Sequence, residues 1–198
     1  MRRYKYIFGP VLSRRLGISL GVDIIKHKTC SLDCIYCECG KTTCLTDKIK
    51  LYVDSSLIIG ELDHFLSEKP NINYITFSGS GEPTLNNDIK KIIDFIKNKY
   101  SIYKICVLTN GTLLYKKNVI SNIINADLII PSLDAADERT FLKINRPYKN
   151  IKYKNHIKGL IKLRKYYKGE IWLEIFIVPG VNDNKNHLIK FKSIINKI

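Results

Sequence analysis

The chain has 198 residues, of which 45% are hydrophobic and 26% are charged. These values are typical of one globular domain and exclude a disordered chain. No apolar run is long enough to cross a bilayer, and the N-terminus lacks the apolar core of a signal peptide, so we expect a cytoplasmic protein. The formal net charge of +15 would attract phosphate groups, although lysines on the polar faces of helices are usually only solvated.

Short apolar runs alternate with amphipathic stretches along the chain. The runs, which we predict to be strands, span residues 18–25, 73–79, 104–110, 127–134 and 171–180. The stretches with helical spacing of apolar residues span residues 55–69, 86–100, 116–124, 153–167 and 184–198. This alternation predicts an α/β protein with a parallel sheet built from βαβ units. Ligands of such sheets and barrels bind at the carboxyl ends of the strands.

Four cysteines lie within CSLDCIYCECG, after the first predicted strand. In a reducing compartment such a cluster indicates a metal site or catalysis more often than disulfides. Cys30, Cys34 and Cys37, spaced C-x-x-x-C-x-x-C, can face one centre from a single loop. Structural zinc uses four protein ligands, whereas three thiolates on a [4Fe–4S] cluster would leave one iron open. We interpret Cys39 and Cys44 as bystanders or as thiols liable to oxidation.

Polar residues and glycines follow the later predicted strands. They are Gly79, Ser80, Gly81 and Glu82 after the second strand, Asn110 after the third, and Ser132 and Asp134 after the fourth. Because the strands are parallel, we expect these residues to share one rim with the cysteine loop. Ordinary interpretations stay open, since Asn110 begins an Asn-Gly turn and Asp134 could cap a helix beginning at Ala135. We expect Cys106, inside the third strand, to be part of the core.

These motifs together resemble those of a known family. The three cysteines, with an aromatic residue (Tyr36) before the last one, resemble the signature of the radical S-adenosylmethionine (SAM) superfamily. The stretch SGSGEPTL resembles the Gly-Gly-Glu motif of that superfamily, with Ser80 in place of its first glycine, and LTNG and PSLDA also fit. The resemblance extends from Phe8 to Asp183. More narrowly, the segment that leads into the cysteines resembles an uncharacterised branch related to the enzymes that make the wyosine base of tRNA.

The resemblance implies a fold, cofactors and a reaction. The barrel of the family has six strands, whereas we find five, so we expect a partial (β/α) barrel and a single domain over residues 1–198 that is truncated at its C-terminus. Cys30, Cys34 and Cys37 would bind a [4Fe–4S] cluster that cleaves SAM reductively. The resulting 5′-deoxyadenosyl radical would abstract hydrogen from a substrate. The residues implied around SAM are Tyr36, Gly79, Ser80, Gly81, Glu82, Asn110, Ser132 and Asp134, with Glu82 facing the ammonium or ribose hydroxyls.

The resemblance specifies the substrate and the partners less closely than the cofactors. An RNA base, a protein glycine and a small metabolite are all consistent with the resemblance, which also implies an electron donor such as flavodoxin or ferredoxin. Arg14, Arg15 and Arg146 could hold phosphate or carboxylate groups, or be solvated or ion-paired. Glu174 could point into the barrel or pair with a lysine. The alternative function is a non-catalytic iron–sulfur electron-transfer module or a zinc-binding module.

The last predicted strand raises a further expectation. In a sheet of five strands it would form an edge, with unpaired backbone groups flanked by apolar side chains. Such edges pair with other chains unless they are covered. We therefore expect self-association, or binding of a partner, at this edge.

Overall fold

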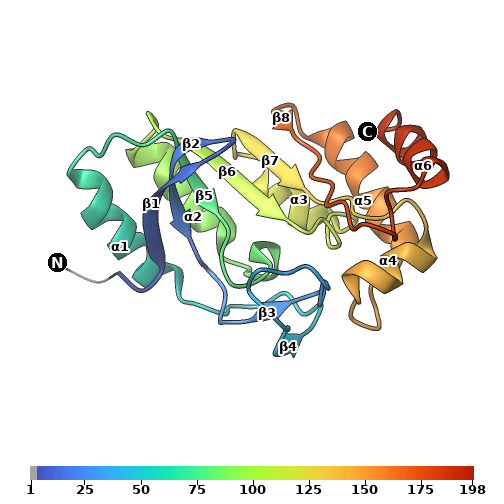
Figure 1. Cartoon of the computed structure of the whole chain (residues 1–198). Coiled ribbons are helices and arrows are strands. Elements are labelled where there is room, and N and C mark those ends of the chain that lie inside the picture. Colours follow the sequence, from blue (N-terminus) through green and yellow to red (C-terminus); the bar gives the residue numbers. More distant parts are fainter. Residues whose placement is uncertain (1–3) are drawn as a thin grey trace.

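The computed structural model describes residues 4–198, and its central feature is one sheet of six strands in the order β1-β2-β5-β6-β7-β8 (Figure 1). The strands are β1 (Ile7–Ser13), β2 (Gly17–Val22), β5 (Tyr74–Phe77), β6 (Lys104–Thr109), β7 (Leu128–Pro131) and β8 (Glu170–Ile171). Each neighbouring pair from β2 to β8 is parallel, which confirms the predicted α/β class and the five parallel strands.

Strand β1 is an addition that the sequence analysis did not predict. It pairs antiparallel with β2, and its register shifts between Phe8 and Val11. Gly9 and Pro10 lie at this irregularity, and Gly9 has a φ of 92°. A Gly-Pro pair is more typical of a turn than of a strand, so the local sequence conceals β1.

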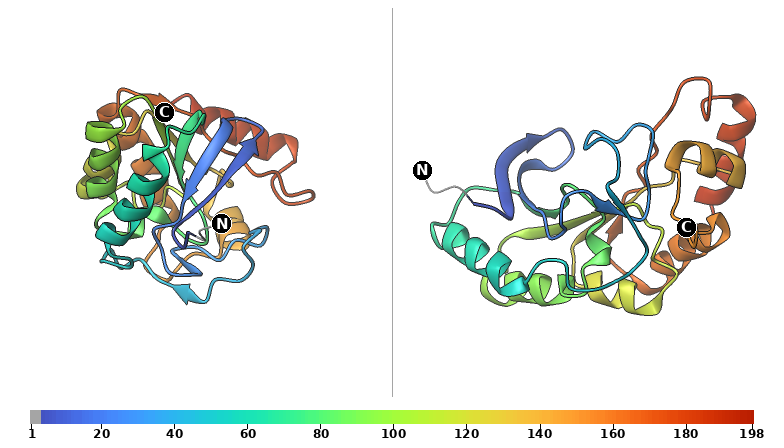
Figure 2. Two further views of the ribbon diagram at one scale, coloured as in Figure 1. Left: turned by 90° about the vertical axis from the view of Figure 1, so that its left-hand side faces the viewer. Right: turned by 90° about the horizontal axis from the view of Figure 1, so that it is seen from below.

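Helices cover one face of the sheet (Figure 2). They are α1 (Ser55–Ser67), α2 (Ile89–Lys99), α3 (Lys117–Ile123) and α5 (Tyr153–Tyr166). The main hydrophobic core lies between these helices and the sheet, and Ile75, Val107 and Ile129 on adjacent strands are fully buried in it. Such burial of apolar side chains is the main stabilising contribution to the fold. No helix among residues 4–198 is both long and apolar enough to span a membrane.

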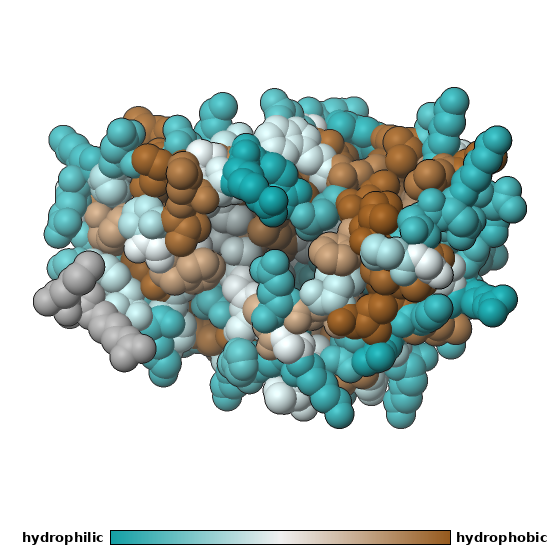
Figure 3. Space-filling model, viewed as in Figure 1, coloured by the Kyte–Doolittle hydropathy of each residue, from teal (hydrophilic) through white to brown (hydrophobic). Residues whose placement is uncertain are grey.

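The opposite, concave face carries a smaller core and polar pairs. Cys106 is fully buried there with Leu16, Leu128 and Ile130, which confirms its predicted place in the core. Further hydrophobic residues on β1 and after β8 remain exposed. In the space-filling view, apolar surface appears toward both sides of the molecule, with hydrophilic side chains between (Figure 3).

The last strand differs from expectation. We predicted a strand over 171–180, but β8 ends at Ile171, and pairing with β7 continues only as an isolated bridge between Ser132 and Glu174. Beyond it, the Phe176 backbone N–H donates to the Asp134 carboxylate instead of to a strand. The side chain of Asp134 thus takes the place of a ladder partner, so the chain leaves the sheet.

Two more helices lie at the end of the sheet that carries β8, namely α4 (Glu138–Asn145) and α6 (Lys185–Ile195). The suggestion that Asp134 caps a helix beginning at Ala135 is wrong. Helix α4 begins at Glu138, and the Asp137 carboxylate accepts the Thr140 backbone N–H at 3.0 Å as its cap.

Candidate functional site

A small two-stranded sheet holds the cysteine loop. Its parallel strands are β3 (Thr29–Cys30) and β4 (Cys44–Leu45). Within the loop the Thr42 N–H donates to the Asp33 carboxylate at 2.7 Å. The Asp33 N–H in turn donates to the Asn145 carbonyl at the end of α4. The loop is therefore fixed both internally and against α4.

Each of the three predicted ligand thiols is half-buried and meets a side-chain N–H donor. The Asn110 amide lies 3.5 Å from the Cys30 sulfur, and the Asn145 amide lies 3.4 Å from the Cys34 sulfur. The ammonium of Lys28 lies 2.8 Å from the Cys37 sulfur. Hydrogen-bonded partners of this kind orient metal ligands and tune them electronically. Cys39 and Cys44 are exposed.

Burial governs the acidity of these groups. It raises the pKa of Cys30 to about 11, with the Glu82 carboxylate adding to the effect, and raises the pKa of Cys34 to about 12. Burial lowers the pKa of Lys28, but the hydrogen bond to Cys37 and the charges of Cys37, Cys30 and Cys39 more than offset this, so its pKa is raised. Thiolates form readily in such a place only beside compensating positive charge, as a bound metal provides.

The three thiols fit an iron–sulfur cluster. They come from one loop, and each has an N–H donor. Thiolate ligands with hydrogen bonds to sulfur are what such clusters use. Within residues 4–198, no group of three or more His, Cys, Asp or Glu side chains is placed so that it could hold a single metal ion.

The Gly79–Pro83 segment packs directly on the cysteine loop. A Cβ atom added at Gly81 would lie 2.0 Å from the Thr29 carbonyl oxygen, so only glycine allows this approach. The Glu82 N–H donates to the same oxygen at 3.1 Å. Ser80 is held by the Asp23 carboxylate, which accepts its N–H at 2.9 Å and its hydroxyl at 2.7 Å. The two motifs of the sequence therefore meet at the residue that precedes Cys30.

Glu82 lies differently from our expectation. Its side chain is buried, with 2% of its surface exposed, and caps the short 3₁₀ helix η1 (Pro83–Leu85). One carboxylate oxygen accepts the Thr84 and Thr109 hydroxyls, and the other accepts the Asn110 N–H at 2.7 Å. Burial raises the pKa of Glu82 in spite of these hydrogen bonds. The carboxylate thus faces its own protein neighbours rather than an open rim, and contact with SAM stays a prediction.

Asp134 links the cysteine loop to the far end of the sheet. Its carboxylate accepts the Tyr36 hydroxyl at 2.5 Å and the Asn145 amide at 2.8 Å. Burial raises the pKa of Asp134 and that of Tyr36. The Tyr36 ring stacks on Phe176, with ring centroids 4.0 Å apart and planes within 6°. Ser132 directly follows β7 and pairs with Glu174 in an isolated bridge.

Comparison with known proteins identifies the family. The family model described as "Radical SAM superfamily" matches residues 24–191, which is most of the chain. The chain belongs to the radical SAM superfamily. Among its relatives, a protein named GTPase Obg from Brachyspira hyodysenteriae is 48% identical over 194 residues. A UPF0026 protein from Methanocaldococcus jannaschii is 33% identical over 193 residues. The matches cover 98% and 96% of this chain, but only 28% and 60% of the respective relatives.

Solved structures of other radical SAM proteins share the fold. The structure titled "Native anSMEcpe with bound AdoMet" superposes with a TM-score of 0.69 at 17% identity, covering 90% of this chain and 49% of that one. The structure of "TYW1 with a lysine-pyruvate adduct bound" superposes with a TM-score of 0.65 at 18% identity, covering 90% and 61%. At these identities the likeness establishes the fold alone.

The arginines that we predicted for substrate binding are not gathered at one place. Arg14 and Arg15 lie in the turn between β1 and β2, before the amino-terminal end of β2, whereas the cysteine loop follows its carboxyl end. Arg15 forms an ion pair with Glu174 at 2.6 Å across the concave face. Glu174 therefore pairs with an arginine, where we had suggested a lysine. Arg146, which ends α4 next to Asp33, is the member of the three beside the cysteines.

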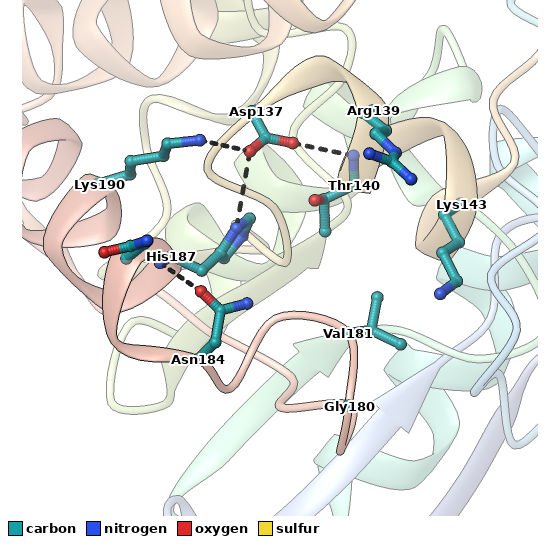
Figure 4. Close-up of a pocket in the computed structure, with 10 residues that line it drawn as sticks. Asp137, Arg139, Thr140, Lys143, Gly180, Val181, Asn184, His187 and Lys190 are labelled. Atoms are coloured by element: carbon teal, nitrogen blue, oxygen red, sulfur yellow. Dashed lines mark hydrogen bonds and ion pairs between the residues drawn. The ribbon is translucent and has the colours of Figure 1, made fainter.

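A pocket of about 600 Å³ lies between α4, α6 and the loop at Gly180 (Figure 4). Arg139 and Lys143 line one side of it, and Lys190 on the other side donates to the Asp137 carboxylate at 2.8 Å. Next to the pocket-lining Val181, the amide of Asn182 donates to the carbonyls of both Asp134 and Phe176. The lining of the pocket could accommodate a small anionic group.

Several residues of the site were missed by the sequence analysis. They are Asp23, Lys28, Asn145 and Phe176. None was singled out as a site residue, and Asn145 is 111 residues away from the cysteine that it contacts. A lysine two positions before the first cysteine is a weak signal that could have directed attention to Lys28.

Proposed function

We propose that this chain is a radical SAM enzyme in which Cys30, Cys34 and Cys37 hold a [4Fe–4S] cluster and SAM binds beside it at the Gly79–Pro83 segment. The observation that supports this most directly is the close packing of Gly81 on Thr29, next to Cys30. It unites the three-thiol loop with the segment that resembles the SAM-binding motif. An electron-transfer module would need only the thiols.

The residues of the chain have separate roles in this proposal. The cluster and SAM, when bound, supply the one-electron cleavage of a sulfonium carbon–sulfur bond that initiates hydrogen abstraction. Asn110 and Asn145 orient two of the thiolates through their amides. Asp134 holds the hydroxyl of Tyr36, and Phe176 covers the Tyr36 ring and limits the access of water. Glu82 acts by fixing the turn that places Gly81 against the loop.

For the substrate we propose only a chemical class. The pocket lined by Arg139 and Lys143 favours a substrate with a phosphate or carboxylate group, which an RNA, a peptide or a small metabolite can each provide. An electron donor such as flavodoxin or ferredoxin would supply the reducing electron in a cytoplasmic setting.

Anaerobic reconstitution followed by a cleavage assay tests the proposal. The protein should become brown, bind about four irons and four sulfides per chain, and convert SAM slowly to 5′-deoxyadenosine and methionine under a strong reductant. Cys30→Ala, Cys34→Ala and Cys37→Ala should each lose the chromophore and the cleavage. Cys39→Ala and Cys44→Ala are the matched controls and should retain both, because their thiols are exposed.

Two results would count against the proposal in different ways. A protein that holds the cluster but neither binds nor cleaves SAM would support the electron-transfer alternative. A colourless protein that binds zinc would support the zinc-binding alternative. Loss of the chromophore in Cys39→Ala, with retention in Cys37→Ala, would refute the assignment of the ligands.

A further inference from the structure

Lys28 is a buried lysine whose ammonium points at a cysteine sulfur. Only 3% of the residue is exposed, and its Nζ atom lies 2.8 Å from the sulfur of Cys37. Its backbone is fixed by β4, because its carbonyl accepts the N–H groups of Thr43 at 3.2 Å and Cys44 at 3.1 Å. The ammonium is therefore delivered to Cys37 by a constrained stretch of chain rather than by a freely moving surface side chain.

Burying an ammonium costs free energy unless an anion or hydrogen-bond acceptor compensates it. None of the ion pairs between carboxylates and basic groups in residues 4–198 includes Lys28. The acceptor that its ammonium meets is the sulfur of Cys37, and the thiols of Cys30 and Cys39 also lie near it. The place of a carboxylate is thus taken by the sulfur of Cys37.

We propose that Lys28 is a positioning residue that stabilises Cys37 as a cluster ligand and raises the reduction potential of the cluster. The inference rests on the proposed function and deepens it. Reduction adds one negative charge to the cluster, so a cation held against a ligand sulfur stabilises the reduced form more than the oxidised form. Hydrogen bonds to sulfur and nearby charge are among the factors that set the potential of iron–sulfur centres.

The other two thiols provide an internal comparison. Cys30 and Cys34 meet neutral amides at 3.5 and 3.4 Å, whereas Cys37 meets a cation at the shorter distance of 2.8 Å. Charge-assisted hydrogen bonds are shorter and roughly twice as strong as neutral ones. The electrostatic contribution at this site is therefore concentrated on one ligand.

A redox titration of three variants tests the inference. Lys28→Gln removes the buried charge, Lys28→Arg keeps it, and Lys26→Gln removes an exposed charge two residues away as the matched control. The midpoint potential is measured from the cluster's absorbance or electron paramagnetic resonance signal, without SAM or turnover. We expect the Lys28→Gln cluster to be at least tenfold less reduced at the wild-type midpoint, which is about 59 mV for one electron. Lys26→Gln should change much less, and Lys28→Arg should restore most of the potential.

The outcomes separate this inference from the proposed function. Equal midpoint potentials for Lys28→Gln and Lys26→Gln would overturn the role of Lys28 while leaving the cluster in place. If Lys28→Gln folds but cannot hold the cluster, retention of the cluster by Lys28→Arg supports the requirement for charge, and loss in both variants overturns it. A wild-type protein that binds no cluster refutes the proposed function, and the inference with it.

Discussion

His156 is a buried titratable side chain on α5, close to the residue that follows β7. It is 4% exposed, and its Nε2 atom forms a hydrogen bond of 3.0 Å with the Ser132 carbonyl. Its Nδ1 atom is buried without a hydrogen-bond partner. Burial lowers the pKa of His156 to about 4, from an ordinary value of 6.5. The folded protein therefore holds this ring neutral where the unfolded chain would bind a proton.

This difference predicts a pH-dependent stability. Between pH 6.5 and about 4 the unfolded state binds the extra proton, so the free energy of unfolding falls as the pH falls. The contribution of His156 should decrease by roughly 2 kcal/mol between about pH 7.5 and about pH 5. Urea denaturation at both pH values measures it.

Variants isolate this effect from the titration of carboxylates. His156→Gln can still donate to the Ser132 carbonyl but does not titrate, so its stability should change less between the two pH values. His27→Gln alters an exposed histidine and should behave as the wild type. An unchanged pH dependence in His156→Gln would contradict the assignment.

At the scale of secondary-structure elements, the site depends on the contact between the turn that precedes η1 and strand β3. Gly81 and Glu82 approach Thr29 so closely that the backbone N–H of Glu82 reaches its carbonyl. Helix α4 makes a second connection, since Asn145 at its end contacts both Cys34 and Asp134. The cysteine loop is thus positioned between elements of both halves of the sheet.

Gly81→Ala should disrupt the first of these contacts. Its Cβ would lie 2.0 Å from a backbone oxygen, and overpacking of this kind typically costs about 1–3 kcal/mol. We expect lower thermal stability and a reduced iron content after reconstitution. Gly60→Ala is the matched control, because Gly60 lies within α1 with open space around it. It should stabilise the helix by about 1 kcal/mol. Equal stability and iron content in Gly81→Ala and the wild type would contradict this contact's importance.

At the scale of the whole molecule, the sheet has open edges at β1 and β8. The β8 edge is shorter than we predicted, but apolar side chains remain exposed beside it, including Trp172, Phe176 and Ile177. At the other edge Leu12 of β1 is 85% exposed. Exposed edges flanked by apolar side chains favour pairing with another chain.

We therefore expect concentration-dependent self-association through the β8 side. Sedimentation velocity over a wide range of protein concentrations should show a shift toward larger species. Trp172→Lys should weaken this association, because it places a charge on the apolar surface next to β8. Leu12→Lys, on the opposite edge, is the control and should leave it unchanged. A monomer at all concentrations would contradict the prediction.

Local sequence patterns determined the order of the five parallel strands, five of the helices and the three-thiol loop. These features depend on residues that are close in the chain or on the common direction of parallel strands. They allowed the α/β class, the five parallel strands and the superfamily to be predicted. They did not reveal β1, because its Gly-Pro pair is typical of a turn.

Only the tertiary structure decided which side chains meet at the site. Glu82 turned inward because Thr84, Thr109 and Asn110 offer it four hydrogen bonds. Arg15 forms an ion pair with Glu174 across the concave face. The donors to the cysteine sulfurs are Lys28, just before β3, Asn110, just after β6, and Asn145, the last residue of α4. Such contacts join residues up to 111 positions apart, and no periodicity in the sequence encodes them, because they arise only when packing of the sheet and helices brings the chain segments together.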